Sequence, residues 1–163
     1  MNRRYPSIML AALASATMLG ACGSSDPKTP VAPQSAVTEL TLGATSLGQV
    51  VTDANGRTLY MFTKDIPGAM TSACTGDCLA LWPPAFSGTT APKATGVTGT
   101  IGTIDVSGKE QVTLDGWPLH YYAPDVAAGD VDGQGVDGEW YVLGATGTPV
   151  KRMPDNGSGG FGY

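Results

Sequence analysis

The sequence contains a single histidine, His120, and no Gly-x-Ser-x-Gly or comparable setting for a nucleophile. A Ser-His-Asp triad would have to use this one histidine. Two carboxylates that could act as a pair, Asp65 and Asp125, are separated by a distance that the sequence does not define. We therefore expect a protein without enzymatic activity and assign no catalytic residue.

Basic residues are also scarce, with nine Lys and Arg against fourteen Asp and Glu and a net charge of −5. Two of the nine, Arg3 and Arg4, belong to the leader described below, so the processed chain carries a net charge of −7. Phosphate binding requires a basic face, which excludes nucleic acid as a partner. A broad electrostatic attachment to anionic lipid is disfavoured for the same reason.

Stretches with the apolar spacing of an amphipathic helix are almost absent, and glycine is abundant at 23 residues. Short runs rich in Val, Thr, Ile, Leu and Tyr alternate instead with turn residues. These runs predict strands near residues 38–43, 47–53, 57–63, 100–106, 110–114, 117–122 and 139–144. The fold class is therefore all-β, and we expect a small sandwich or barrel with one short helix near residues 76–82.

Punctuation residues place the helix and the turns. In "GDCLALWP", Asp77 is expected to cap the first helical turn and Pro83 to end the helix. "DANGR" predicts a hairpin turn in which both central residues, Asn55 and Gly56, take positive φ. "VSGKE" and "LDGWP" predict turns of the same kind, and residues 86–99 are expected to form a long polar loop.

Residues 1–21 are predicted to be a lipoprotein signal peptide, with two arginines followed by an apolar run. The run is too short and too rich in Ala and Ser for a transmembrane helix. It closes with "LGAC", which resembles the bacterial lipobox, whose cysteine carries lipid and becomes the new N-terminus. The alternative is an ordinary secretory signal cut near Ala21, which would leave Cys22 free.

The remainder divides by composition. Residues 22–36, beginning at the lipidated Cys22, are rich in Ser, Pro and Ala and predict a flexible tether. Residues 37–150 are expected to form the β domain, and residues 151–163 a flexible tail. The lipid makes the membrane the first expected partner. Gly23 after the cysteine favours the outer over the inner membrane if the source is Gram-negative.

Lipidation of Cys22 leaves two of the three cysteines, Cys74 and Cys78 in "CTGDC". The compartment outside the cytoplasmic membrane is oxidising, and two cysteines allow one intramolecular disulfide. A bridge across so short a loop stabilises the fold by about 2 kcal/mol according to the loop-entropy relation. We expect its main role to be local, in fixing the turn before "LALWPP".

The domain contains an internal repeat, because "NGRTLYMFTKD" aligns with "DGWPLHYYAPD". The aligned pairs include Gly56 and Gly116, Leu59 and Leu119, Phe62 and Tyr122, and Asp65 and Asp125. A Gly-rich loop and then a tryptophan, Trp82 or Trp140, follow each copy. The sequence thus predicts two related hairpin units, at about residues 47–85 and 100–145, that share one core.

These copies, together with "CTGDCLALWPP" and "GDVDGQGVDGEWYVL", resemble the bacterial secreted-repeat lipoproteins over about residues 47–145. The signature of that family is Tyr-x-aromatic-x-x-Asp. The first copy matches it fully and the second has histidine in place of the tyrosine; the positions are Tyr60, Phe62 and Asp65, then His120, Tyr122 and Asp125. The resemblance implies an envelope lipoprotein of unknown function and supplies no catalytic residue.

We interpret the signature residues as structural, with a role in the core and in the turns rather than in binding. In a strand, the first two signature residues of each copy point to one face. We expect the aromatic residues to enter the core, and Asp65 and Asp125 to accept backbone N–H bonds just past the strand ends. The alternative is a shared binding face of tyrosines and acids.

A copper site is one sharper hypothesis. Cys74, Cys78 and His120 resemble, at that one point, the ligands of the copper-delivery proteins that assemble respiratory oxidase. Soft thiolates and imidazole suit copper(I), with Met61 or Met70 as a fourth ligand. Those proteins have a thioredoxin-like fold, whereas no strand–helix–strand alternation occurs here. We therefore favour a plain disulfide and predict no cofactor.

A calcium site is a second hypothesis, because "DVDGQGVDGEWY" begins like an EF-hand loop. Its candidate ligands are Asp130, Asp132 and Asp137. The twelfth position is Tyr141, where a bidentate Glu is required. We favour a solvated Gly/Asp turn.

The function predicted from these observations is that of a lipid-anchored protein of the cell envelope with a non-catalytic binding or interaction module. Its partner would be an envelope protein or a small ligand. One alternative is an envelope redox or copper-handling accessory protein that uses Cys74, Cys78 and His120. Another is a purely structural envelope component.

Overall fold

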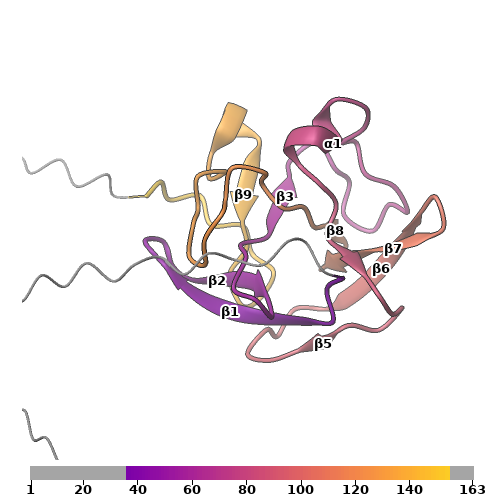
Figure 1. Cartoon of the computed structure of the whole chain (residues 1–163), viewed down its shortest axis with the longest axis horizontal. Helices are drawn as coiled ribbons and strands as arrows, with labels where there is room; N and C mark the ends of the chain where they lie inside the picture. Colours follow the sequence, from indigo (N-terminus) through magenta and orange to yellow (C-terminus); the bar gives the residue numbers. More distant parts are fainter. Residues whose placement is uncertain (1–35, 155–163) are drawn as a thin grey trace, which may run out of the picture.

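Strands dominate the computed structural model, which describes residues 36–154 (Figure 1). The predictions of a signal peptide, of lipid on Cys22 and of most of the tether and tail concern residues outside this range. The elements are β1 (Glu39–Thr45), β2 (Gly48–Asp53), β3 (Tyr60–Phe62), α1 (Cys78–Leu81), β4 (Phe86–Ser87), β5 (Lys93–Ala94), β6 (Ile101–Val106), β7 (Lys109–Leu114), β8 (Trp117–Pro118), the 3-10 helix η1 (Val136–Gly138) and β9 (Trp140–Val142). Within residues 36–154, no helix is long and apolar enough to cross a membrane.

Two antiparallel hairpins, β1–β2 and β6–β7, form the frame of the fold. The first belongs to a sheet of order β2-β1-β5, and the second to a sheet of order β4-β7-β6 in which β8 also pairs with β7. β3 and β9 form a third, two-stranded sheet (Figure 1). The described strands do not close into a barrel, and the arrangement is sandwich-like, which confirms the all-β class and the sandwich alternative.

The inner strands β2 and β7 are largely buried, and their apolar and β-branched residues made them predictable from the sequence. The last four residues of β2 and of β7 are buried on both faces, as Val-Val-Thr-Asp and Gln-Val-Thr-Leu. Two of their polar side chains are hydrogen-bonded: Gln111 donates to Leu119 O at 2.9 Å, and the Thr52 hydroxyl bonds that of Thr41 at 2.9 Å. Buried strands of this kind are apolar and β-branched rather than strictly alternating.

The predicted strands agree with the observed ones except at the motif. The predicted runs 57–63 and 117–122 contain only β3 and β8, because single bridges such as Thr52–Thr58 and Tyr60–His120 replace continuous ladders there. β4 and β5 lie inside the stretch 86–99 that was predicted to be a loop. Strands of two residues have no alternation that a sequence pattern could reveal.

The helix is present but is not capped as predicted. Asp77 occupies the N-cap position of α1 without a side-chain capping bond. The first amides of α1 are already satisfied by the turn that precedes it, because Cys78 N–H donates to Thr75 O and Leu79 N–H to Gly76 O. The Asp77 carboxylate therefore has no free amide to accept.

The "DANGR" turn also differs from the prediction, because only Gly56 takes positive φ there, at 81°. Asp53 Oδ1 accepts the amides of Asn55 and Arg57, both at 2.9 Å, and Gly56 N–H donates to Asp53 O. The turn is therefore organised by an aspartate at its start rather than by two left-handed residues. The other two turns follow the prediction, with φ of 55° and 80° at Ser107 and Gly108 and of 48° and 80° at Asp115 and Gly116.

The two copies are related by an approximate two-fold axis that passes between Tyr60 and His120. These residues occupy the same place in the two copies and pair with each other: Tyr60 N–H donates to His120 O at 2.8 Å, and His120 N–H donates to Tyr60 O at 2.9 Å. Equivalent bonds repeat on either side, from Val51 N–H to Leu143 O at 2.8 Å and from Val112 N–H to Ala85 O at 2.9 Å. The predicted repeat is thus a symmetric pairing of two halves.

Candidate functional site

Four aromatic rings form one stack across the two-fold axis, in the order Phe62, Trp140, Trp82, Tyr122. Successive ring centroids lie 4.2, 3.8 and 4.4 Å apart. The two tryptophans are equivalent residues of the two copies, and their rings are parallel within 3°. Each is only 2% exposed, so the stack belongs to the core that both copies share.

The tyrosine and aspartate of the signature bond across the axis. Tyr60 OH, from the first copy, donates to Asp125 Oδ2 of the second at 2.6 Å. Asp125 Oδ1 accepts the amide of Asp132 at 3.1 Å, which fits the prediction that the acid holds a following loop. Burial raises the pKa of Tyr60 far above its usual range, and the nearby Asp125 charge adds to the shift. Burial likewise raises the pKa of Asp125.

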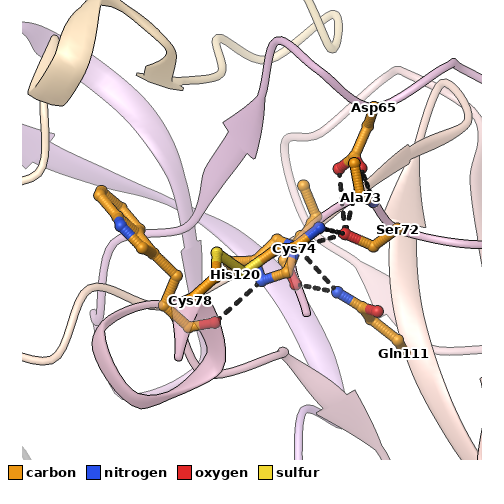
Figure 2. Close-up of a disulfide and its surroundings, with 9 residues drawn as sticks. Asp65, Ser72, Ala73, Cys74, Cys78, Gln111 and His120 are labelled. Atoms are coloured by element: carbon orange, nitrogen blue, oxygen red, sulfur yellow. Dashed lines mark hydrogen bonds between the residues drawn. A yellow bond between two sulfur atoms is a disulfide. The ribbon is translucent and has the colours of Figure 1, made fainter. Parts of the chain in front are cut away.

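The equivalent bond from the second copy to Asp65 of the first cannot form, because His120 stands where the signature has tyrosine. Asp65 would accept from that missing phenol, and instead Ser72 Oγ donates to Asp65 Oδ1 at 3.1 Å (Figure 2). Asp65 Oδ1 also accepts the Ala73 amide at 2.6 Å. Ser72 Oγ lies 3.3 Å from His120 Nε2, so serine and histidine together fill the place of one tyrosine. Burial raises the pKa of Asp65, although these two hydrogen bonds oppose the shift.

His120 is fully buried, and both of its ring nitrogens contact protein groups (Figure 2). Nδ1 lies 3.0 Å from Trp82 O and therefore carries the proton that it donates. Gln111 Nε2 lies 3.2 Å from His120 Nε2 and donates to it. Burial lowers the pKa of His120 to about 4, so the imidazole is neutral at pH 7.

Acid should destabilise the fold through His120. Its pKa is about 4 when folded and 6.5 in its ordinary state, so the unfolded chain binds the proton first. The stabilisation from this group is complete above about pH 6.5, and about 3 kcal/mol of it is lost as the pH falls to about 4. Urea unfolding across this pH range should show the loss in the wild type and not in His120→Gln.

Comparison of the wild type with His120→Gln cancels the contributions of the other titrating groups to the pH dependence of stability. The pKa values of Asp65 and Asp125 are raised, so these carboxyls act in the opposite direction at low pH, equally in both proteins. Parallel stability curves for the wild type and His120→Gln would show that His120 is not the group responsible.

Removal of the Tyr60 hydroxyl should also be costly. Tyr60→Phe leaves Asp125 Oδ2 without its 2.6 Å donor in a buried place. A hydrogen bond to a charged group contributes about 1.5–3 kcal/mol, and we expect a loss of that size in urea unfolding. The exposed Tyr141 hydroxyl donates to Gly138 O, so Tyr141→Phe serves as the control and should change stability by less than about 1 kcal/mol.

Cys74 and Cys78 form the predicted disulfide, with their Cα atoms 5.4 Å apart. The bridge closes the loop that leads into α1, as expected from the sequence. Double replacement by serine should lower the free energy of unfolding by about 2 kcal/mol. The measurement is urea unfolding of the oxidised wild type and the double variant; equal midpoints and slopes would show that the bridge adds no stability.

The predicted copper ligands do not form an open site here. The two sulfurs are bonded to each other, and both nitrogens of His120 are engaged by protein groups. Met61 lies in the aliphatic core, while Met70 is 67% exposed. No group of three or more His, Cys, Asp or Glu residues suited to a metal ion occurs within residues 36–154.

The predicted calcium ligands Asp130, Asp132 and Asp137 do not form a group suited to a metal ion within residues 36–154. Asp130 Oδ2 accepts the amides of Val126 and Ala127 at 3.0 and 2.7 Å, which closes a loop. Asp137 lies in η1 with a left-handed φ of 54°. The interpretation as a Gly/Asp turn fits this geometry.

Asp65, Ser72 and His120 are the three residue types of a hydrolytic triad, but their hydrogen bonds connect them in a different order. The serine lies between the carboxylate and the imidazole, whereas a triad requires the imidazole between the other two. His120 Nδ1 bonds a backbone carbonyl rather than a carboxylate. This geometry offers no base for Ser72 that an aspartate orients.

A groove of about 320 Å³ lies between the disulfide loop and the tip of the β6–β7 hairpin. We call it the disulfide groove; its walls include Met70, Cys74, Leu79, Pro84 and Val106. Polar residues also line it: Thr71, Ser72, Thr75, Asp105, Ser107 and the buried Gln111. Met70 was predicted only as a copper ligand and Ser72 was not predicted at all, because nothing in the linear sequence pattern shows which loop meets the hairpin.

The equivalent position beside the β1–β2 hairpin holds another hollow, of about 670 Å³. Its lining includes small residues and the acids Asp130 and Asp132. Its exposed lining is about equally polar and apolar, whereas that of the disulfide groove is mainly apolar. Of these two hollows, the disulfide groove is the one that a disulfide braces.

The protein is an all-β module of two symmetric copies, in which a disulfide closes one loop. A family model described as a secreted repeat of unknown function matches residues 41–86 and 103–144, one segment for each copy. The chain belongs to this family, which places it outside the cytoplasm or in the cell envelope. Comparisons with curated proteins and with solved structures gave no match.

Proposed function

We propose that this protein is a lipid-anchored, non-catalytic binding module of the cell envelope and that the disulfide groove holds its ligand. The observation that carries the proposal is the lining of this groove, whose exposed surface is mainly apolar and which also includes polar side chains such as Ser72 and Gln111. Ligand sites in proteins typically combine a mainly apolar lining with a few placed polar groups.

The groove also has the mechanical properties of a recognition site. The Cys74–Cys78 bridge and Pro84 stiffen two of its walls, so little order has to be gained on binding. Met70 is 67% exposed at its rim, and a flexible thioether adapts to apolar partners of different shape. These features support an apolar side chain or a small apolar ligand as the bound group.

The lipid anchor is tested on the full-length chain. Cells fed an alkyne fatty acid should label the wild type, and Cys22→Ser should abolish both the label and partition into detergent. Label that persists in Cys22→Ser would place the modification elsewhere and overturn the proposed anchor.

Binding is tested by a photocrosslinker at Met70 or Thr75, on the rim of the groove, in the protein exported by its own host. The same adduct is expected at both positions. A crosslinker at Thr90, which is exposed in the 86–99 stretch, is the control and should give no such adduct. Met70→Glu should remove the adduct formed at Thr75. Equal adducts at all three positions would mean that the groove has no special role.

A further inference from the structure

The two hairpins are equivalent, but their outer edges are not. The outer edge of β1 is covered by β5, which runs parallel to it over Lys93–Ala94. Lys93 N–H donates to Thr38 O at 3.1 Å and Thr95 N–H to Leu40 O at 2.9 Å. Leu40, which pairs with Ala94 of β5, is fully buried.

β6 is the edge strand of its sheet, and its outward groups can be identified from its neighbour β7. Val112 N–H donates to Ala85 O and Val112 O accepts from Leu119 N–H, so both groups of Val112 point away from β6. Val112 is directly opposite Thr103. In such a non-hydrogen-bonded antiparallel pair, the N–H and C=O groups of each residue point away from the other strand, so those of Thr103 point away from β7.

The same alternation turns the backbone groups of Ile101 and Asp105 outward. Residues 36–154 make no backbone hydrogen bond to the outward groups of Ile101, Thr103 or Asp105. Ile101, the counterpart of the fully buried Leu40, is only half-buried. The row of donors and acceptors that β5 covers on β1 is therefore open on β6.

The segment that would cover β6 by symmetry is held elsewhere. Lys93 follows Trp82 at the same spacing as Lys151 follows Trp140, so residues 151–153 correspond to the covering segment of β1. Gln134 Nε2 donates to Val150 O at 2.6 Å and to Arg152 O at 2.8 Å, and the Arg152 guanidinium donates to Leu47 O at 2.5 Å. These bonds carry residues 150–152 toward the β1–β2 hairpin and away from β6 (Figure 1).

We propose that the outer edge of β6 binds an extended segment of a partner protein, which adds to the sheet as a parallel strand in the way that β5 adds to β1. This site adjoins the disulfide groove, whose lining includes Asp105 and Val106 of β6, but it uses the outward backbone groups of the strand and goes beyond the function proposed for the groove. Addition of a strand to an open edge supplies affinity through main-chain hydrogen bonds. β6 reads "IGTIDV" and carries neither the lysine nor the proline that commonly blocks an edge.

The occupied edge indicates the chemistry of the partner. β5 presents a basic and a small residue, Lys93 and Ala94, and a basic segment also suits a chain with a net charge of −5. A second copy fits less well, because two β6 strands related by a two-fold axis pair antiparallel and bring like net charges together.

The probe is a peptide of residues 89–97, "TTAPKATGV", which contains the segment that already pairs with β1. Amide hydrogen exchange of the mature chain is measured with and without this peptide. At a peptide concentration about ten times its Kd, exchange at Ile101, Thr103 and Asp105 should slow about tenfold. Thr103→Pro removes an outward N–H without touching the β6–β7 ladder and should abolish this protection. Thr103→Val keeps the N–H and should retain it.

Each outcome decides the proposal, and the wild-type exchange does so even if Thr103→Pro does not fold. No slowing at a saturating concentration of peptide would overturn it, and so would slowing at Asp105 and other residues of the disulfide groove without slowing at Ile101 and Thr103. A chain that forms a dimer with these three amides already protected would show that a second copy occupies the edge, which also overturns it. Met70→Glu should leave the protection unchanged, so failure of the groove and failure of the edge are distinguishable.

Discussion

Replacement of Trp82 by alanine should lower the free energy of unfolding by about 3–5 kcal/mol. Trp82 contacts three rings: it stacks on Trp140, packs against Tyr122 at 4.4 Å and receives the edge of Tyr60 at 5.4 Å. At 2% exposure, its removal opens a cavity at the axis that neither copy can fill alone. Urea unfolding monitored by far-UV circular dichroism measures the loss.

A double-mutant cycle with Trp140→Ala isolates the stacking. Aromatic pairs are coupled by about 0.5–1.5 kcal/mol beyond their buried area, so the two losses should not add. Trp117 is half-buried and lies outside the stack, and Trp117→Ala is the control with a smaller expected loss. A loss for Trp82→Ala no larger than that of Trp117→Ala would contradict the central role of the stack.

Gly116→Ala should be the second severe substitution, with an expected loss of about 2–5 kcal/mol. Gly116 has a φ of 80°, which disfavours any residue with a Cβ atom. A Cβ there would also overlap Gly68 N and lie 3.1 Å from Gly68 Cα, and backbone atoms cannot move aside cheaply. Gly68 N–H donates to Gly116 O, so this contact ties the loop after the first motif to the second copy.

Gly108 provides a matched control within the same protein. It occupies the same position of the same kind of turn, also with a φ of 80°, but no atom lies within 4 Å of its would-be Cβ. Gly108→Ala should therefore show only the backbone cost, of about 1–2 kcal/mol. The difference between the two variants measures the close approach to Gly68, and equal losses would show that the loop simply moves away.

Features set by a few neighbouring residues could be predicted from the sequence. They include the turns at Gly108 and Gly116 and the motif that places Phe62 and Tyr122 at equivalent positions of the two copies, and the structure shows each of them. Once Cys22 was assigned to the lipid, the two remaining cysteines allowed a single pairing, which is the one observed. β5 was missed because two residues carry no period.

The exchange of partners between the copies could not be predicted. An aspartate that binds within its own copy and one that binds the other copy give the same sequence pattern, and Tyr60 is 65 residues from Asp125. The role of Ser72 was hidden for a related reason. It matters only because His120 is shorter than the tyrosine it replaces, and the geometry that shows this joins residues 48 positions apart.

The pairing at Tyr60 and His120 has a consequence for the order in which the molecule can be made. The first copy leaves the ribosome without the second, and until then its Tyr60 hydroxyl, its Trp82 face and its Val51 amide have no partners. Contacts between residues so distant in the chain must form late and together, which makes folding slow and all-or-none. Half of this protein is therefore not a smaller version of the whole, and the early chain exposes aromatic surface that only its own continuation can cover.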